Sequence, residues 1–238
     1  MKPHFPVIIL CGRPASGKSE VIDFLKKTPV DERHRRFGIG EFEEIDDFPM
    51  LWTWFEEDAL LQKIMGKPRM HTDDDGYFLF QYQWDLLIER ISLEYDKKLR
   101  DTDYHDTRTA ILEFSRGTEH GGYRSAFSHL NDAILEKALI VYINVTYEES
   151  LRKNRKRFNP DRPDSILEHG LPDEKLEKLY HDVDWEEVSA DSPTHIEING
   201  KQVPYVVFEN MPSKTDDPAL LGPALDEVFV KARTLYGG

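Results

Sequence analysis

Cysteine, long apolar runs and net positive charge are all scarce in this sequence of 238 residues. A single cysteine, Cys11, excludes an intrachain disulfide and favours a cytoplasmic location. No apolar stretch approaches the length of a membrane span, and the run from Val7 to Cys11 is too short for the core of a signal peptide. The formal charge of −14 argues against nucleic acids and anionic membranes as partners.

The length suits one domain, residues 1–238, and strand-like and helix-like stretches alternate along it. We therefore predict an α/β fold whose mainly parallel five-stranded sheet is flanked by helices, with a small hairpin at Asn199-Gly200 before the last strand. The predicted strands are 7–11, 36–40, 109–114, 138–145 and 205–208. The first predicted helix begins near Gly17. The later predicted helices cover 50–64, 77–99, 125–137, 148–158, 174–180 and 220–235.

The clearest motif runs from Gly12 to Ser19 and fits G-x-x-x-x-G-K-[ST] at every fixed position. The apolar run from Val7 to Cys11 precedes it, and apolar residues follow it at helical spacing. This order predicts nucleoside triphosphate binding, because the N–H groups of such a loop and helix N-terminus meet phosphate oxygens. We expect ATP, with Lys18 reaching the β- and γ-phosphates and Ser19 ligating Mg²⁺. The predicted nucleotide-binding residues of the loop are Gly12, Arg13, Pro14, Ala15, Ser16, Gly17, Lys18 and Ser19.

Two charged residues lie at the end of the third predicted strand, where a ligand of a parallel sheet should bind. They are Glu113, at the end of the strand, and Arg116, in the turn after it. A kinase needs a carboxylate near Mg²⁺ or beside the acceptor hydroxyl, and we assign this role to Glu113. Arg116 is then a candidate for stabilising the transferred group. The alternative is a purely structural ion pair at the edge of the sheet.

A basic run follows the fourth predicted strand in an otherwise acidic chain. On a helix, Arg152 and Arg155 share one face. Because phosphoryl transfer needs cations that a closing lid can supply, we predict that residues 148–172 form a lid-like insertion with Arg152 and Arg155 as catalytic residues. The alternative is a solvated helix face.

Two acidic groups, at 41–47 and 73–75, lie on the side where an acceptor would bind. Trp52 and Trp54 follow the first group, and acids with aromatic rings suit a polar acceptor that carries a hydroxyl or an amine. We therefore interpret residues 41–107 as an acceptor-side helical region. The alternative is a solvated acidic loop beside two core tryptophans, and the sequence leaves open whether these acids bind substrate, metal or a protein partner.

Asn210 follows the last predicted strand, where a loop that contacts the nucleotide base would fall, so we include it among the nucleotide-binding residues. With these residues placed, the chain resembles a P-loop kinase of the nucleoside monophosphate kinase-like group. The resemblance covers most of the chain, but the only motif specific to it is Gly12 to Ser19. The basic helix is similar to the lid of that group, and Asn210 to an asparagine that often follows the last strand. Glu113-Phe-Ser-Arg116 resembles the acid and arginine of deoxynucleoside kinases, with a different spacing.

The residues and the resemblance together imply an ATP- and Mg²⁺-dependent phosphotransferase with a small-molecule acceptor. The acidic stretch after the second strand departs from monophosphate kinases, which need cations there. Two alternatives stay open: a nucleotide-dependent regulatory ATPase or switch that acts on a protein partner, and a module that binds nucleotide without chemistry. The acceptor, the preference for ATP over GTP and the oligomeric state are not determined by the sequence.

Overall fold

The computed structural model describes residues 4–157 and 170–236. Its strands form one sheet in the order β2-β3-β1-β4-β6-β5, in which β5 alone runs antiparallel to its neighbour. The strands are β1 Val7–Gly12, β2 Glu41–Asp46, β3 Arg108–Phe114, β4 Ala138–Asn144, β5 His195–Ile198 and β6 Lys201–Glu209. The sheet is therefore the expected α/β type, mainly parallel, with β5 and β6 as the predicted hairpin.

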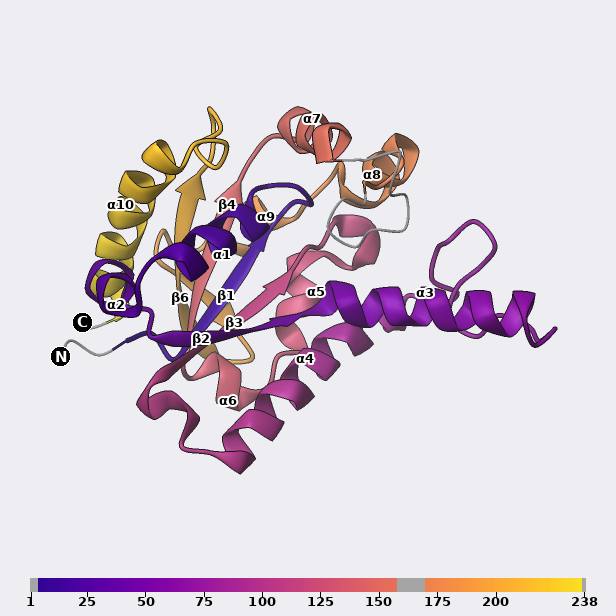
Figure 1. Cartoon of the computed structure of the whole chain (residues 1–238), viewed down its shortest axis with the longest axis horizontal. Helices are drawn as coiled ribbons and strands as arrows, with labels where there is room; N and C mark the ends of the chain where they lie inside the picture. Colours follow the sequence, from indigo (N-terminus) through magenta and orange to yellow (C-terminus); the bar gives the residue numbers. More distant parts are fainter. Residues whose placement is uncertain (1–3, 158–169, 237–238) are drawn as a thin grey trace.

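The helices connect successive parallel strands and cover both faces of the sheet (Figure 1). Short 3₁₀ helices, η1 Tyr104–Asp106 and η2 Thr118–His120, lie on either side of β3. The α-helices are α1 Lys18–Lys27, α2 Val30–Phe37, α3 Asp47–Lys63, α4 Tyr82–Asp101, α5 Gly122–Ser128, α6 Asp132–Leu135, α7 Tyr147–Arg157, α8 Asp173–Tyr180, α9 Trp185–Val188 and α10 Pro218–Tyr236.

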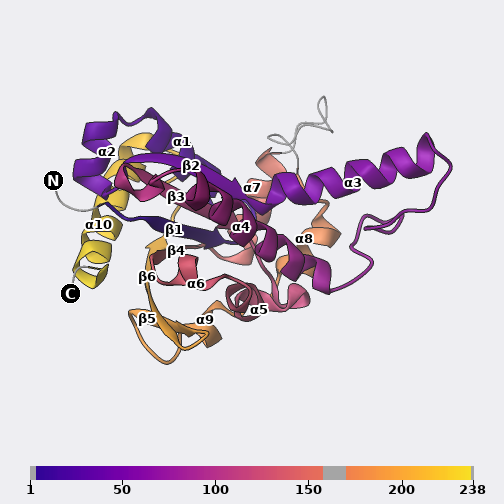
Figure 2. The ribbon, with the colours of Figure 1, turned by 90° about the horizontal axis from the view of Figure 1, so that it is seen from below.

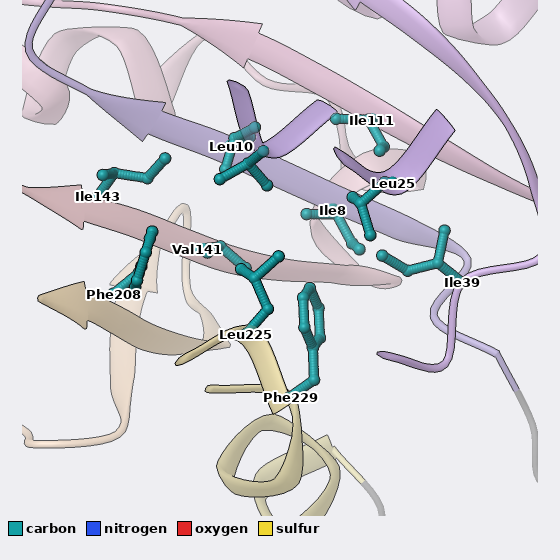
Figure 3. Close-up of a pocket in the computed structure, with 11 residues that line it drawn as sticks. Ile8, Leu10, Leu25, Ile39, Ile111, Val141, Ile143, Phe208, Leu225 and Phe229 are labelled. Carbon is teal, nitrogen blue, oxygen red and sulfur yellow. The ribbon is translucent and has the colours of Figure 1, made fainter. Parts of the chain in front are cut away.

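Alternation along β1 builds two cores, because successive side chains of a strand point to opposite faces. Ile8 and Leu10 pack toward α1, α2 and α10, whereas Val7 and Ile9 pack toward α4, α5 and α6. In the first of these cores, side chains from the strands meet Leu25 of α1 and the apolar residues of α10 (Figure 3). The central strand is thus buried on both faces, and its carboxyl end is held rigidly at one edge.

A long arm leaves this edge of the sheet. Helix α3 projects away from the body, and the loop at its end returns to α4 (Figures 1 and 2). Asp58 is buried on α3 and accepts hydrogen bonds from the N–H groups of Met70, His71 and Thr72, which fixes the returning loop. Among the described residues, none of the helices combines the length and the apolar character that a membrane crossing requires.

The second strand was predicted at 36–40, and the structure corrects this to Glu41–Asp46. Arg36 and Phe37 end α2 instead, and Gly38 closes that helix in the left-handed conformation. The strand pairs with β3, and cations from other elements contact its acids: Lys98 contacts Glu43, and Lys26 Nζ lies 2.6 Å from the carboxylate of Glu44. Residues 41–46 are therefore an edge strand and not a solvated loop.

Other boundaries also differ from the sequence-based prediction. The sheet has six strands because β5 joins it, and the stretch 125–137 is two helices, not one. Asn131 separates them, since its side chain accepts a hydrogen bond of 3.0 Å from the N–H of Ile134 and caps α6. Helix α4 starts later than predicted, at Tyr82. Much of the predicted lid, residues 158–169, lies outside the described residues.

Candidate active site

The phosphate loop, Gly12–Ser19, connects β1 to α1 at the carboxyl edge of the sheet. Two glycines are required there by geometry, because Gly12 and Gly17 have φ angles of +156° and +115°. A Cβ atom on Gly12 would also lie 2.7 Å from the carbonyl oxygen of Ile143 on the neighbouring strand. Only glycine fits this close approach, and the loop brings its N–H groups to the N-terminus of α1, where anions bind favourably.

Lys18 is buried against the loop, with 7% of its surface exposed. Its ammonium donates hydrogen bonds to the Ser115 hydroxyl at 2.7 Å and to the Arg13 carbonyl at 3.2 Å. The nearest carboxylate oxygen, Oε1 of Glu113, lies 4.0 Å away. The structure thus brings together the loop lysine and the acid that the sequence placed at the end of the third strand.

A second carboxylate stands beside Glu113. Asp46 ends β2 and is the register partner of Glu113 in β3. Burial, with the charges of Glu113 and Asp47 as smaller causes, raises the pKa of Asp46 to about 8. Burial also raises the pKa of Glu113, while Lys18 lowers it. The charge of Glu113 therefore acts on the ionisation of Asp46, and the two neighbouring carboxyls are coupled.

Arg116 is held by a buried ion pair. Its guanidinium is 2% exposed and donates to the Asp47 carboxylate at 2.6 Å, and to the carbonyl oxygens of Ser115 and Trp84 at 2.7 and 3.1 Å. Of the alternative, in which Glu113 pairs structurally with Arg116 or another base, the pairing with Arg116 is wrong, since Arg116 pairs with Asp47 and the base near Glu113 is Lys18. These contacts fix the Arg116 side chain in the wall of the site, and its role in stabilising the transferred group stays a prediction.

All these groups line one cavity of about 400 Å³. Beyond the carboxylates, the cavity is bounded by five rings that we call the aromatic wall: Phe48, Trp52, Phe55, Phe78 and Trp84. The first three lie on one face of α3, since they are four and three residues apart. Trp54, by contrast, is buried and stacks on His71. Trp54 is therefore in the core, whereas Trp52 faces the cavity.

The predicted lid arginines do not line this cavity. Arg152 pairs with Glu149 at 2.7 Å and with Asp216 at 3.3 Å, and Arg155 pairs with Asp173 at 2.6 Å. Both arginines are about half exposed, which is the solvated-face geometry. The residues of α7 that do line the cavity are Asn154 and Arg157. Arg152 and Arg155 can approach a nucleotide only if α7 moves, so their catalytic roles stay predictions.

The loop residues divide into those that line the cavity and those that hold the loop. Pro14, Ala15, Gly17, Lys18 and Ser19 line it. The guanidinium of Arg13 instead binds the carbonyl oxygens of Tyr180 and His181 at the end of α8, the second of these at 2.9 Å.

Asn210 is fully buried, and its amide donates to the carbonyl oxygen of Ser16 at 2.8 Å. Its side-chain oxygen accepts a hydrogen bond from the N–H of Lys214 at 2.7 Å. Asn210 therefore supports the phosphate loop from behind, and its contact with a nucleotide base stays a prediction.

Sequence reasoning placed Asp46 and Trp52 on the acceptor side only as parts of a larger acidic and aromatic group, and it missed the pairing of Asp46 with Glu113 and the other rings of the wall. Asp46 was absorbed into an acidic stretch because the second strand was placed too early. The wall left a usable signal, since Phe48, Leu51, Trp52 and Phe55 follow helical spacing. That spacing predicts an apolar helix face, but it does not show whether the face packs in the core or lines a cavity.

The predicted acidic group at 73–75 forms a turn. Asp73 accepts a hydrogen bond of 2.8 Å from the N–H of Tyr77, and Asp74 accepts one from Gln62 at 2.8 Å. The carbonyl oxygen of Asp75 accepts from Lys175 of α8. No group of three or more potential metal-ligating His, Cys, Asp or Glu residues occurs within 4–157 and 170–236.

No protein-family model matches the sequence, and no curated protein matches it. Among solved structures, the chain is similar to an unliganded sugar kinase from Janibacter (15% identity, 99% of this chain and 95% of that chain, TM-score 0.40). It is also similar to Kti12 from Chaetomium thermophilum in complex with ADP-AlF3 (14%, 98% and 100%, TM-score 0.46). A deoxyadenosine kinase from M. mycoides matches as well (12%, 96% and 99%, TM-score 0.44). In this chain the phosphate loop follows β1, a central strand of a mainly parallel α/β sheet, as the sequence predicted.

Proposed function

We propose that this protein is an ATP-dependent phosphotransferase that moves the γ-phosphoryl group to the hydroxyl of a small molecule. One observation carries the proposal: the phosphate loop, the Asp46–Glu113 pair and the aromatic wall open into the same cavity. A nucleotide's phosphates and an acceptor can therefore meet at the carboxylates. Such positioning is most of what phosphoryl transfer requires of a protein.

The phosphate end of the cavity suits Mg·ATP. Backbone N–H groups of residues 13–19 surround the phosphates, and Lys18, released from Ser115, reaches across the β- and γ-phosphates. The Ser19 hydroxyl and the Glu113 carboxylate are hard oxygen donors at the same cavity, which fits Mg²⁺. Mg²⁺ would neutralise charge on the phosphate oxygens.

The carboxylate pair supplies the acceptor's base. The acceptor O–H gives its proton to the pair, the resulting oxygen forms a bond to the γ-phosphorus, and the bond to the β-phosphate oxygen breaks to leave ADP. Because burial and neighbouring charges raise the pKa of Asp46 to about 8, its base form is ionised Asp46, which becomes more populated as the pH rises toward 8. With Glu113 near Lys18, Asp46 is the member better placed on the acceptor side.

The aromatic wall selects the body of the acceptor. Five rings favour a flat, largely apolar group through stacking, and the Asp47–Arg116 pair adds fixed polar contacts at its edge. We therefore propose an acceptor that joins a planar ring to a hydroxyl. Its partners then include neither nucleic acid nor membrane.

The test is ADP release from Mg·ATP across a panel of acceptors: nucleosides, nucleoside monophosphates, aromatic alcohols and amino sugars. Lys18→Ala is the control. A strong increase with ring-bearing alcohols that the variant loses would support the proposal. Slow release that no acceptor changes would instead favour the alternative, a regulatory ATPase that acts on a protein partner.

A further inference from the structure

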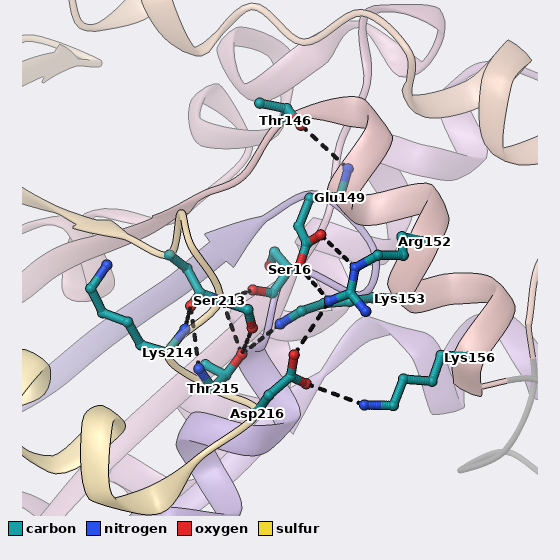
Figure 4. Close-up of polar contacts among 11 residues, drawn as sticks. Ser16, Thr146, Glu149, Arg152, Lys153, Lys156, Ser213, Lys214, Thr215 and Asp216 are labelled. Carbon is teal, nitrogen blue, oxygen red and sulfur yellow. Dashed lines mark hydrogen bonds and ion pairs between the residues drawn. The ribbon is translucent and has the colours of Figure 1, made fainter.

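The phosphate loop is also held by residues that do not line the cavity (Figure 4). Asn210, which donates to the carbonyl oxygen of Ser16, also donates to the Thr215 hydroxyl at 2.9 Å. Thr215 packs directly on the loop, because a Cβ atom on Gly17 would lie 2.7 Å from its methyl group. The position of Thr215 therefore sets the positions of Ser16 and Gly17.

A lysine from α7 fixes Thr215. Lys153 is 6% exposed, and its ammonium donates to the Thr215 hydroxyl at 2.6 Å. One turn earlier, the Ser150 hydroxyl donates to the Pro14 carbonyl at 2.7 Å. Helix α7 thus contacts the phosphate loop directly at Pro14, and through Thr215 at Ser16 and Gly17.

Burying an ammonium is costly, so this lysine calls for an explanation. Burial lowers the pKa of Lys153, and the nearby carboxylates, Asp216 first, act in the opposite direction. In contrast, Arg152 and Lys156 contact Asp216 from the solvent side of the same helix (Figure 4). An apolar residue would serve packing better at this position, whereas a cation behind the loop favours bound phosphate.

We propose that Lys153 is a positioning residue for nucleotide binding, which through Thr215 and Asn210 fixes the backbone of the phosphate loop and links α7 to it. The inference rests on the proposed function in one respect, that the loop binds phosphate. Sequence reasoning assigned the catalytic cations of this helix to Arg152 and Arg155, which lie at the surface. Lys153, the buried lysine between them, acts on the phosphate loop through Thr215.

The test replaces Lys153 by methionine, which keeps the length and removes the charge. We expect the Kd for Mg·ATP to rise about ten-fold, with little change in the unfolding temperature. We also expect amide hydrogen exchange of residues 13–19, measured without nucleotide, to become about ten-fold faster. Lys98→Met is the matched control, because Lys98 joins α4 to Glu43 of β2 and does not contact the phosphate loop.

A second pair of variants separates the hydrogen bond from packing. Thr215→Ser keeps the hydroxyl that accepts from Lys153, whereas Thr215→Val keeps the shape and removes it. We expect the serine variant to retain slow exchange and tight binding, and the valine variant to behave like Lys153→Met. This pair also decides the question if Lys153→Met does not fold.

The outcomes distinguish this inference from the proposed function. Unchanged loop exchange in both Lys153→Met and Thr215→Val would overturn the inference, whatever the nucleotide affinity. Faster exchange without any nucleotide binding by the wild-type protein would support the positioning of the loop and refute the proposed function. Equal loss of stability and binding in Lys98→Met would show a general effect of removing a lysine, and this too would overturn the inference.

Discussion

The carboxyl group of Asp46 tests how burial sets charge at the candidate active site. Its pKa is raised from 3.8 to about 8, first by burial and then by the charges of Glu113 and Asp47. At a pH between 3.8 and about 8, the carboxyl is ionised in the unfolded chain and protonated in the folded protein. The folded state therefore binds more protons, and the free energy of unfolding falls with rising pH by up to about 1.4 kcal/mol per unit.

Asp46→Asn removes this dependence and keeps the structural role. Asp46 caps α3 by accepting a hydrogen bond of 2.9 Å from the N–H of Phe48, and asparagine caps helices equally well. We expect the variant to be more stable than the wild type by about 2–4 kcal/mol at pH 7. The lower value applies where protonation is divided between Asp46 and Glu113. The difference should vanish below about pH 3, where the carboxyl is protonated in both states.

Urea unfolding at several pH values between about 5 and 8 measures this difference. Asp226→Asn is the control, because it removes a carboxylate that is 42% exposed and pairs with Arg36 at the surface. Its stability should follow the wild type in parallel. Parallel curves for Asp46→Asn as well would refute the reasoning, since they would show that Asp46 is ionised in the folded protein.

Three further predictions follow from the site. Asp47→Asn should cost about 3–5 kcal/mol of unfolding free energy, because Arg116 is left buried and unpaired, while Asp226→Asn should cost about 0–1 kcal/mol; equal losses in urea unfolding would contradict this. Glu113→Gln should lower kcat about a hundred-fold with a nearly unchanged Kd for ATP, and near-normal turnover would reject its role. Trp52→Ala should raise the KM of the acceptor about ten-fold without affecting ATP binding, and an unchanged KM would remove this ring from the acceptor site.

The sequence alone was sufficient for the phosphate loop and for the class of fold. Gly12 to Ser19 is a local motif, and it can be recognised from residues that are adjacent in the chain. A continuous apolar run such as 138–145 also predicts a strand, because a strand buried on both faces must be apolar along its whole length. Glu113 was found for the same reason, at the end of such a strand.

Tertiary structure decided the rest, because those features depend on partners far apart in the chain. The acidic strand β2 pairs with β3, and Lys26, Lys98 and Arg108 from other parts of the chain pair with its glutamates, which no pattern within 41–46 shows. The same holds for charge: Arg152 and Lys153 are neighbours in a basic run, yet one is solvated and the other is buried on Thr215. Sequence shows which residues carry charge, whereas packing decides which of those charges are removed from water and therefore act on the site.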